Sequence, residues 1–237
     1  RNTGIQKTRG IKRKEEFETA FTDALNLNEV DPQYSGILNL YDSLYEKMES
    51  IALARDYFIE IAYRGVEIIK FANKASKFIR TGSIKDLEKF KKTISGHFKN
   101  YDANTDALLF DALLHKYHTD QADSEYLPAY FNGKIYTSSE VFSKSYFANQ
   151  EDLEDLFNSS LKKIQKQLSK DPAFKVSSAL YGHYRDVIYS KYWAIEDELD
   201  ALDRLYIKAM MEVLPDYRNY YPDANSTLRL TYGQVPV

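Results

Sequence analysis

The sequence contains no cysteine in its 237 residues, and it is poor in glycine and proline. The absence of cysteine excludes disulfide bonds, thiolate nucleophiles and cysteine-based zinc sites. With only 9 glycines and 6 prolines, few positions break the chain, which favours long helices over a sandwich of short strands. Hydrophobic residues make up 43% and aromatic residues 14% of the chain, so the composition is that of a folded protein.

An excess of one charge and a long apolar run are also missing. The 32 basic and 35 acidic residues give a net charge of −3, whereas a nucleic-acid-binding protein typically has a basic excess, so we expect no nucleic-acid partner. No apolar run approaches the ~20 residues that a membrane span needs, and no signal peptide is recognisable. Because the chain begins at Arg1 rather than Met, we expect that the real N-terminus has been removed, so the missing signal peptide is uninformative.

Apolar residues recur every three to four positions through most of the chain, as in amphipathic helices. We therefore predict a mainly α fold of seven or eight long amphipathic helices in one domain. The predicted helical stretches are residues 10–27, 37–79 as one long helix or two separated by a kink at Gly65, with a stop at Gly82, a helix from Ser83 with a capping pattern to Asp86, 105–117, a helix from 149 or 150 to 168, and 172–213 with a stop at Pro215. The stretch SGHFKNYDANTD (95–106) is expected to form a loop.

Two short segments have a β pattern instead. Asn132-Gly133 lies between short aromatic runs, and this pattern is typical of a small hairpin. Near the C-terminus, a turn at 222–226 leads into residues 228–232, which alternate like a strand. The second strand has no obvious partner in the chain, so we expect it to be poorly ordered, or to pair with residues 131–137 or a neighbouring molecule.

The sequence has no self-contained catalytic motif: a phosphate-binding loop, G-x-S-x-G and H-E-x-x-H are all missing. Asp111, His115 and His118 share one helix face, which a metal could use. The favoured interpretation is a solvated helix end, where positive charge is favourable. We predict no metal and no cofactor, and a metal-dependent hydrolase on these three residues stays open as an alternative.

Two further patterns are interpreted as structural. Asp102-x-Asn104-x-Asp106 opens like a calcium loop, but an EF-hand needs glycine at the sixth position and glutamate at the twelfth, and this chain has neither. The aromatic clusters at 57–58, 189–193 and 217–221 are interpreted as core and interface. A tyrosine-rich wall facing a peptide is the alternative, because aromatic side chains contribute contact area at low entropic cost.

Four stretches together resemble a known family: RNTGIQKTRGIKRKEEFE (1–18), SGHFKNYDANTDALLFDALL (95–114), IYTSSEVFSKSYF (135–147) and YYPDANSTLRLTYGQV (220–235). They are similar to the helical region of bacterial serine dipeptidyl peptidases, which include dipeptidyl peptidases seven and eleven of Bacteroidetes and related bacteria. That family has a chymotrypsin-like double β-barrel with a His-Asp-Ser triad, and an inserted helical domain covers the cleft. Its members remove dipeptides from the free N-terminus of oligopeptides in the periplasm or outside the cell, typically as homodimers, without metal or organic cofactor.

The resemblance implies that residues 1–219 are a helical lid domain and that residues 220–237 re-enter a catalytic barrel absent from this chain. The family's motifs around the catalytic Ser and His are missing, so we assign no catalytic residue and expect the chain to be inactive alone. Its implied partners are the oligopeptide substrate and the barrel of the same parent chain. The choice between acidic and hydrophobic residues at the cleavage site is made largely by the barrel in this family, so the sequence does not predict it.

One substrate-binding residue follows from the resemblance. The family uses an Asn in a Lys-Asn pair at the entry of the helical domain to hold the substrate's α-amino group, and Arg1-Asn2 is the nearest counterpart. An Asn side-chain oxygen can accept hydrogen bonds from an ammonium group, so Asn2 is the candidate; a frayed, solvated terminus is the alternative. The alternative for the whole chain is a free-standing helical module that binds peptides or glycans without enzymatic activity.

Overall fold

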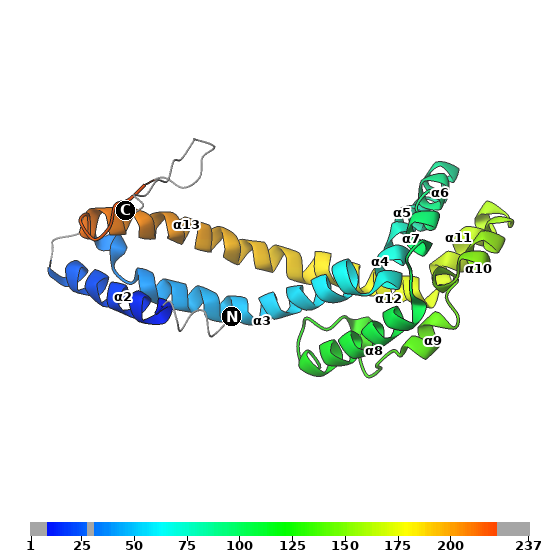
Figure 1. Ribbon diagram of the computed structural model, residues 1–237, viewed down its shortest axis with the longest axis horizontal. Coiled ribbons are helices and arrows are strands. Elements are labelled where there is room, and N and C mark those ends of the chain that lie inside the picture. The colour runs from blue at the N-terminus through cyan, green and yellow to red at the C-terminus, as the bar shows by residue number, and fades with distance from the viewer. Residues whose placement is uncertain (1–8, 28–30, 222–237) are drawn as a thin grey trace, which may run out of the picture. The chain divides into compact units, whose positions relative to one another are not determined.

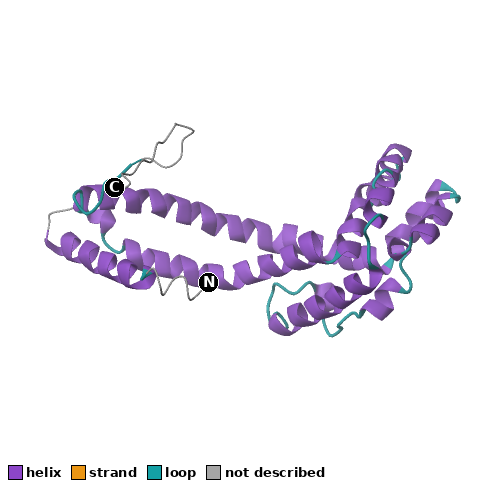
Figure 2. Cartoon of the chain, viewed as in Figure 1, coloured by secondary structure: helices purple, strands orange, loops and turns teal. Residues whose placement is uncertain are grey.

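The computed structural model describes residues 9–27 and 31–221. Within these ranges helices alternate with loops and no strand is present (Figures 1 and 2), so the predicted mainly α fold is confirmed. The predicted strand at 228–232 lies outside the described residues. The elements are α2 (Gly10–Leu27), η1 (Pro32–Tyr34), α3 (Ile37–Phe58), η2 (Ile59–Gly65), α4 (Glu67–Lys74), α5 (Ser76–Thr81), α6 (Ile84–Lys91), α7 (Ile94–Phe98), α8 (Ala103–Asp120), η3 (Ala129–Phe131), α9 (Ser138–Phe142), η4 (Tyr146–Ala148), α10 (Gln150–Phe157), α11 (Leu161–Lys170), α12 (Pro172–His183), η5 (Tyr184–Ile188) and α13 (Tyr189–Val213).

The chain divides into two compact units, with the division points inside α3 and α13. The first unit comprises residues 1–43 and 198–237. Aromatic side chains form its core: Phe21 is fully buried, and its ring lies edge-on to Tyr206 with centroids 5.4 Å apart. Tyr34 is buried as well, and its hydroxyl donates a hydrogen bond to Glu212 Oε2 at 2.5 Å. Ring packing and this hydrogen bond join η1 and α2 to the C-terminal half of α13.

The second unit comprises residues 44–197, and its core lies where α4 packs against α12. Helix α4 is strongly amphipathic and buries Ile68, Ile69 and Phe71 almost completely. The buried Ser177 of α12 donates its hydroxyl hydrogen to the carbonyl oxygen of Ile69 at 2.9 Å. Since a buried hydroxyl needs a partner, this bond fixes the register of the two helices.

Two buried carboxylates cap helices of the second unit. Asp106 in α8 accepts hydrogen bonds from the backbone N–H groups of Glu67 and Ile68, at 2.6 and 2.9 Å, and therefore caps α4. Asp171 caps its own helix, α12, through the N–H groups of Ala173 and Phe174. The first turn of a helix has unpaired N–H groups that favour negative charge, so these carboxylates stabilise the two central helices of the core.

Gly65 ends a π-helical segment at the predicted kink. In η2 the backbone N–H of Val66 donates to the carbonyl oxygen of Ile61, five residues earlier, at 3.0 Å. A Cβ atom on Gly65 would lie 2.2 Å from the carbonyl oxygen of Glu60, closer than any carbon can approach without a shift. The break between α3 and α4 therefore requires glycine. Gly82 likewise ends α5 in the left-handed conformation, with φ +63°, as predicted.

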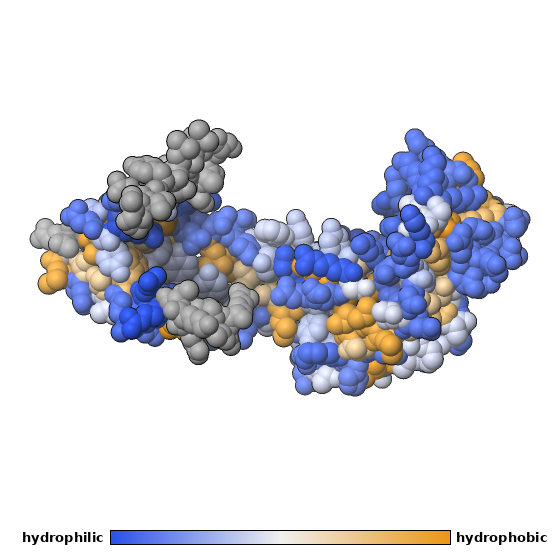
Figure 3. All heavy atoms as spheres, viewed as in Figure 1, coloured by the Kyte–Doolittle hydropathy of each residue, from blue (hydrophilic) through white to orange (hydrophobic). Residues whose placement is uncertain are grey.

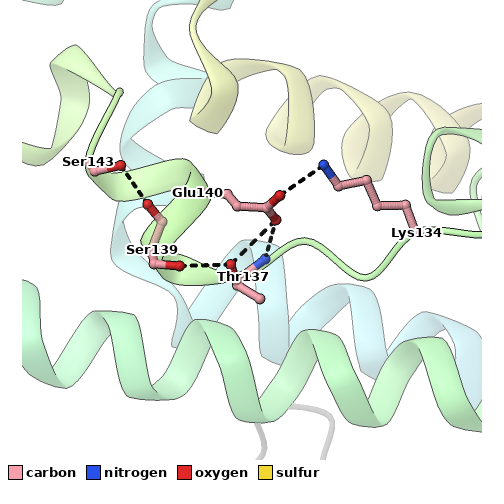
Figure 4. A network of polar contacts seen from close by, with 5 residues as sticks. All are labelled: Lys134, Thr137, Ser139, Glu140 and Ser143. Carbon is pink, nitrogen blue, oxygen red and sulfur yellow. Dashed lines mark hydrogen bonds and ion pairs between the residues drawn. The ribbon is translucent and has the colours of Figure 1, made fainter.

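The predicted hairpin around Asn132-Gly133 is wrong. The segment forms a turn of 3-10 helix, η3, and a turn with Gly133 at φ +68°, with no strand on either side. Stacked rings of Tyr130 and Tyr136, 4.9 Å apart, hold the segment together in place of a backbone ladder. A capping box between Thr137 and Glu140 then starts α9, and the neighbouring Lys134 pairs with Glu140 at 3.0 Å (Figure 4).

Four local predictions also differ from the structure. Residues 94–98 form the short helix α7 where a loop was expected, and Ser83 makes no side-chain cap because Asp86 accepts from Thr81 instead. The stretch 150–168 is two helices, α10 and α11, separated at 158–160. The stretch 172–213 is interrupted by the π-helical η5. In the last two cases the apolar periodicity continues across the break, so periodicity alone predicted one helix.

Candidate functional site

The predicted substrate-binding residue, Asn2, lies outside the described residues, as does the segment 222–237. The structure does place the other sequence candidates. Asp111 accepts hydrogen bonds from the backbone N–H and the hydroxyl of Ser138, both at 2.6 Å, and so anchors α9 on α8. His118 Nε2 lies 3.2 Å from the carbonyl oxygen of Phe131, and His115 is exposed. In the described part of the chain no three His, Asp or Glu side chains form a metal-binding group.

The calcium-like pattern is explained by helix capping. Asp102 accepts from the backbone N–H of Thr105 at 2.6 Å and caps α8. Asp106 caps α4 and also accepts from the Tyr101 hydroxyl at 3.1 Å. Burial raises the pKa of Asp106, while its hydrogen bonds act in the opposite direction. Both aspartates therefore have structural partners that account for them.

Serine and histidine side chains do not pair within residues 9–27 and 31–221. The chain has 4 histidines, all in this part, and none of them is hydrogen-bonded to a serine hydroxyl in the structure. His97 is stacked on Phe71 at 3.9 Å, its Nε2 has no partner, and burial lowers its pKa to about 4. His183 Nε2 is also unpartnered, and burial lowers the pKa of this ring. A nucleophile paired with a base is thus not formed by these histidines.

Aromatic rings connect the two π-helical segments. Phe58, directly before η2, stacks face to face on Tyr184 of η5, with centroids 4.0 Å apart. Tyr181 packs edge-on against Phe58 and donates its hydroxyl hydrogen to the carbonyl oxygen of Ala62 at 2.9 Å. This bond satisfies a carbonyl within a π-helical segment, where the regular pattern is interrupted. Segments of π-helix occur frequently at functional sites.

The same row of rings reaches the surface. Tyr184 contacts Tyr189, and Tyr189 contacts Trp193, at centroid distances of 6.0 and 6.2 Å. Tyr189 and Trp193 are about half exposed, at 51% and 44%. The 189–193 cluster is therefore not part of the core, contrary to that part of the prediction: Tyr189 and Trp193 form an exposed aromatic face, and Tyr192 is half-buried. Figure 3 shows a further region of hydrophobic surface near α8. Leu108, a residue of α8, is also exposed.

A hollow of about 430 Å³ lies beside these rings, and we call it the basic hollow. Helices α4, α5 and α12 and the segment η5 form its walls. Its polar lining is Asn73, Ser76, Lys77, Arg80, Ser178 and Arg185. Its apolar lining is Ile79, Phe174, Gly182 and the ring of Tyr181. Three cationic side chains and no carboxylate line it, so the hollow is suited to an anionic group attached to an apolar stem.

Sequence analysis did not find the basic hollow. Its two halves, residues 73–80 and 174–185, meet because α4 packs on α12, where Ser177 bonds to Ile69 across 108 positions of sequence. One local signal was available: Gly182 sits at an interior position of the predicted helix 172–213. Glycine costs about 1 kcal/mol relative to alanine in a helix interior, so its presence there calls for a reason.

Comparison with known proteins shows to which family the chain belongs. The family described as Peptidase S46 matches residues 1–236. An Asp/Glu-specific dipeptidyl-peptidase of Flavobacterium psychrophilum is 28% identical over 98% of this chain and 34% of its own length. A dipeptidyl-peptidase 7 of Capnocytophaga gingivalis is 27% identical over 97% of the chain and 32% of its own length. The chain thus spans about a third of the length of these relatives. Among the described residues, no helix combines the length and the apolar character that a membrane span requires. The match over nearly every residue shows that this chain belongs to the peptidase S46 family.

Proposed function

We propose that this chain is the helical lid domain of a serine dipeptidyl peptidase that releases dipeptides from the free N-terminus of oligopeptides. The observation that carries the proposal is the family match over residues 1–236 combined with coverage of about a third of each relative. The remaining two thirds would contain the catalytic barrel with its His-Asp-Ser triad. Residues 220–237 would lead the chain back into that barrel, and the parent would act in the periplasm or outside the cell, as a homodimer.

The internal structure of the second unit supports a covering role. Its core around Ile68, Phe71 and Phe110 is almost completely buried, and buried carboxylates fix the starts of α4 and α12. A rigid cover can block a cleft beyond two substrate residues, which would make a peptidase release dipeptides. Closing on the substrate would also exclude water and orient the scissile bond. The exposed aromatic face at Tyr189 and Trp193 is a candidate surface for contact with the peptide substrate.

Removal of the domain tests the lid. If residues 1–219 of the full-length parent are replaced by a short linker, we expect dipeptide release to disappear or cleavage to lose its dependence on a free N-terminus. Mass spectrometry of the products from an oligopeptide measures both. Unchanged release of dipeptides alone would contradict the proposal. The isolated chain is expected to hydrolyse no peptide.

Recognition of the substrate's ammonium group is assigned to Asn2. A hydrogen bond to a charged group contributes about 1.5–3 kcal/mol, so Asn2→Ala in the full-length parent is expected to lower kcat/KM for dipeptidyl substrates by roughly 10- to 150-fold. Asn104→Ala is the matched control, because Asn104 is an exposed residue in the first turn of α8. If the Asn2 variant keeps the wild-type kcat/KM, the assignment is wrong.

A further inference from the structure

The basic hollow has an excess of positive charge that its surroundings only partly neutralise. Lys77 pairs with Asp86 at 3.4 Å. Arg185 makes two hydrogen bonds with Asp186, at 2.7 and 2.9 Å. Arg80 is exposed and has no carboxylate partner among the described residues. One guanidinium group is therefore available to a ligand in a chain whose net charge is −3.

Gly182 keeps the hollow open. A Cβ atom at this position would meet no atom within 4 Å, so packing does not demand glycine there. The residue lies within α12, and no left-handed conformation demands glycine either. Glycine in a helix interior is unfavourable relative to alanine, and here that cost leaves empty space beside the cationic side chains. A larger side chain would project into the hollow.

The lining also offers hydrogen-bond donors. The exposed Ser178 hydroxyl has no partner within the described residues. Asn73 lies next to Tyr181. Burial raises the pKa of Tyr181, and the contact with Asn73 offsets part of this rise. The rings of Phe174 and Tyr181 supply apolar surface. At about 430 Å³ the hollow has the size of a small-ligand site.

We propose that the basic hollow binds a carboxylate group of an acidic peptide, with Arg80 as the main charged contact and Gly182 as the position that leaves room for it. A planar guanidinium group matches a carboxylate through two parallel hydrogen bonds. The apolar walls then cover the aliphatic stem of the side chain, which a free phosphate ion does not have. Only the identification of the ligand as a peptide rests on the proposed function. The carboxylate could come from an Asp or Glu side chain or from a peptide C-terminus.

Titration of the isolated 237-residue chain with short blocked peptides tests the proposal. The probes are acetyl-Gly-Glu-Glu-Gly-amide, the same peptide with Gln for Glu, the Gln peptide with a free C-terminal carboxylate, and inorganic phosphate. Binding is followed by NMR shifts of backbone amides. We expect the Glu peptide to bind more tightly than its Gln counterpart, with shifts at residues 73–80 and 174–185. Binding of the free-carboxylate peptide alone would identify the C-terminus as the source.

Four variants test the location of the site. Arg80→Gln is expected to weaken binding of the Glu peptide by roughly tenfold or more, the effect of losing a charge-assisted pair. Arg204→Gln removes the same charge from an exposed arginine outside the hollow and should leave affinity unchanged. Gly182→Leu should abolish binding while circular dichroism shows an intact helical fold, and Gly182→Ala should raise thermal stability.

Four results would overturn the proposal. The first three are equal affinity for the Glu and Gln peptides without tighter binding of the free-carboxylate peptide, equal losses in the Arg80 and Arg204 variants, and unchanged binding in a folded Gly182→Leu variant. Phosphate that binds as tightly as the Glu peptide would also overturn it. Since the assay uses the isolated chain and measures no hydrolysis, its outcome is independent of the domain-removal experiment on the parent enzyme.

Discussion

Replacement of Asp171 by asparagine is expected to change how the stability of the chain depends on pH. The carboxyl group of Asp171 is almost completely buried and accepts hydrogen bonds from the Ser145 hydroxyl and from the backbone N–H groups of Tyr146 and Ala173, at 2.8, 2.8 and 2.9 Å. Burial raises its pKa from 3.8 to about 6, although these hydrogen bonds act in the opposite direction. Desolvation of the charged form is thus the larger effect.

The sign and size follow from linkage between protonation and folding. Because the pKa is higher in the folded chain than in the unfolded chain, the folded chain holds this proton more tightly, and stability falls as pH rises from 3.8 through about 6. A shift of about two pKa units corresponds to about 3 kcal/mol. Asparagine does not titrate. The free energy of unfolding of Asp171→Asn, relative to the unmodified chain, should therefore rise by about 2.5 kcal/mol between pH 4 and pH 7, since the unfolded carboxyl group is already mostly ionised at pH 4.

Urea unfolding followed by far-ultraviolet circular dichroism, repeated from pH 4 to pH 7.5, measures this difference. Other titrating groups cancel when the variant is compared with the unmodified chain at each pH. Asp102→Asn is the matched control: Asp102 also caps a helix, but it is exposed, and hydrogen bonds to Thr105 hold its pKa below the ordinary value. The relative stability of Asp102→Asn should not rise with pH over this range, because the stabilisation by a carboxylate with a lowered pKa is lost only as pH falls below 3.8. The reasoning would be refuted if the difference in unfolding free energy between Asp171→Asn and the unmodified chain were constant with pH, or if it fell as pH rises.

Three further predictions concern the core of the second unit. Burial lowers the pKa of His97 from 6.5 to about 4, so the unfolded chain binds this proton more tightly and the unmodified chain loses stability as pH falls through that range. His97→Phe should remove this loss. An identical pH dependence of urea unfolding in the variant and the unmodified chain would contradict the prediction. Ile68→Ala should cost about 2–5 kcal/mol of unfolding free energy, because Ile68 is fully buried, whereas Leu108→Ala, at a position 72% exposed, should change it by less than about 0.5 kcal/mol; equal losses in urea unfolding would show that the core is assigned wrongly. Gly65→Ala should lower the melting temperature strongly, because the added Cβ would lie 2.2 Å from the Glu60 carbonyl oxygen, and a variant as stable as the original would show that η2 does not require glycine.

Local sequence signals predicted part of this fold well. The apolar stripe of residues 10–27 corresponds to α2 at both ends, and Gly65 and Gly82 mark real breaks because each occupies a backbone position that a larger residue would strain. The Asn132-Gly133 signal predicted a turn correctly but not its context. A hairpin needs a partner strand, and ring stacking of Tyr130 on Tyr136 took its place.

Features that depend on contacts between distant parts of the chain could not be predicted from the sequence. In the sequence, Asp106 belongs to a pattern that resembles a calcium loop. In the structure it caps α4, a helix distant in sequence, because α8 packs against the start of α4. The basic hollow joins residues from α5 and α12 that no spacing rule connects. Among the residues of the basic hollow, only Gly182 could be noticed from the sequence alone. Glycine lowers helix propensity whatever its tertiary neighbours are.

The lid is tested most directly by a selectivity ratio in the full-length parent. The measurement is kcat/KM for an oligopeptide with a free N-terminus divided by kcat/KM for the same peptide with an acetylated N-terminus. It is made with residues 1–219 present and with them replaced by a short linker. The account predicts a large ratio with the helical domain and, without it, a ratio near one or no release of dipeptides. A ratio that is equally large in both proteins would contradict it.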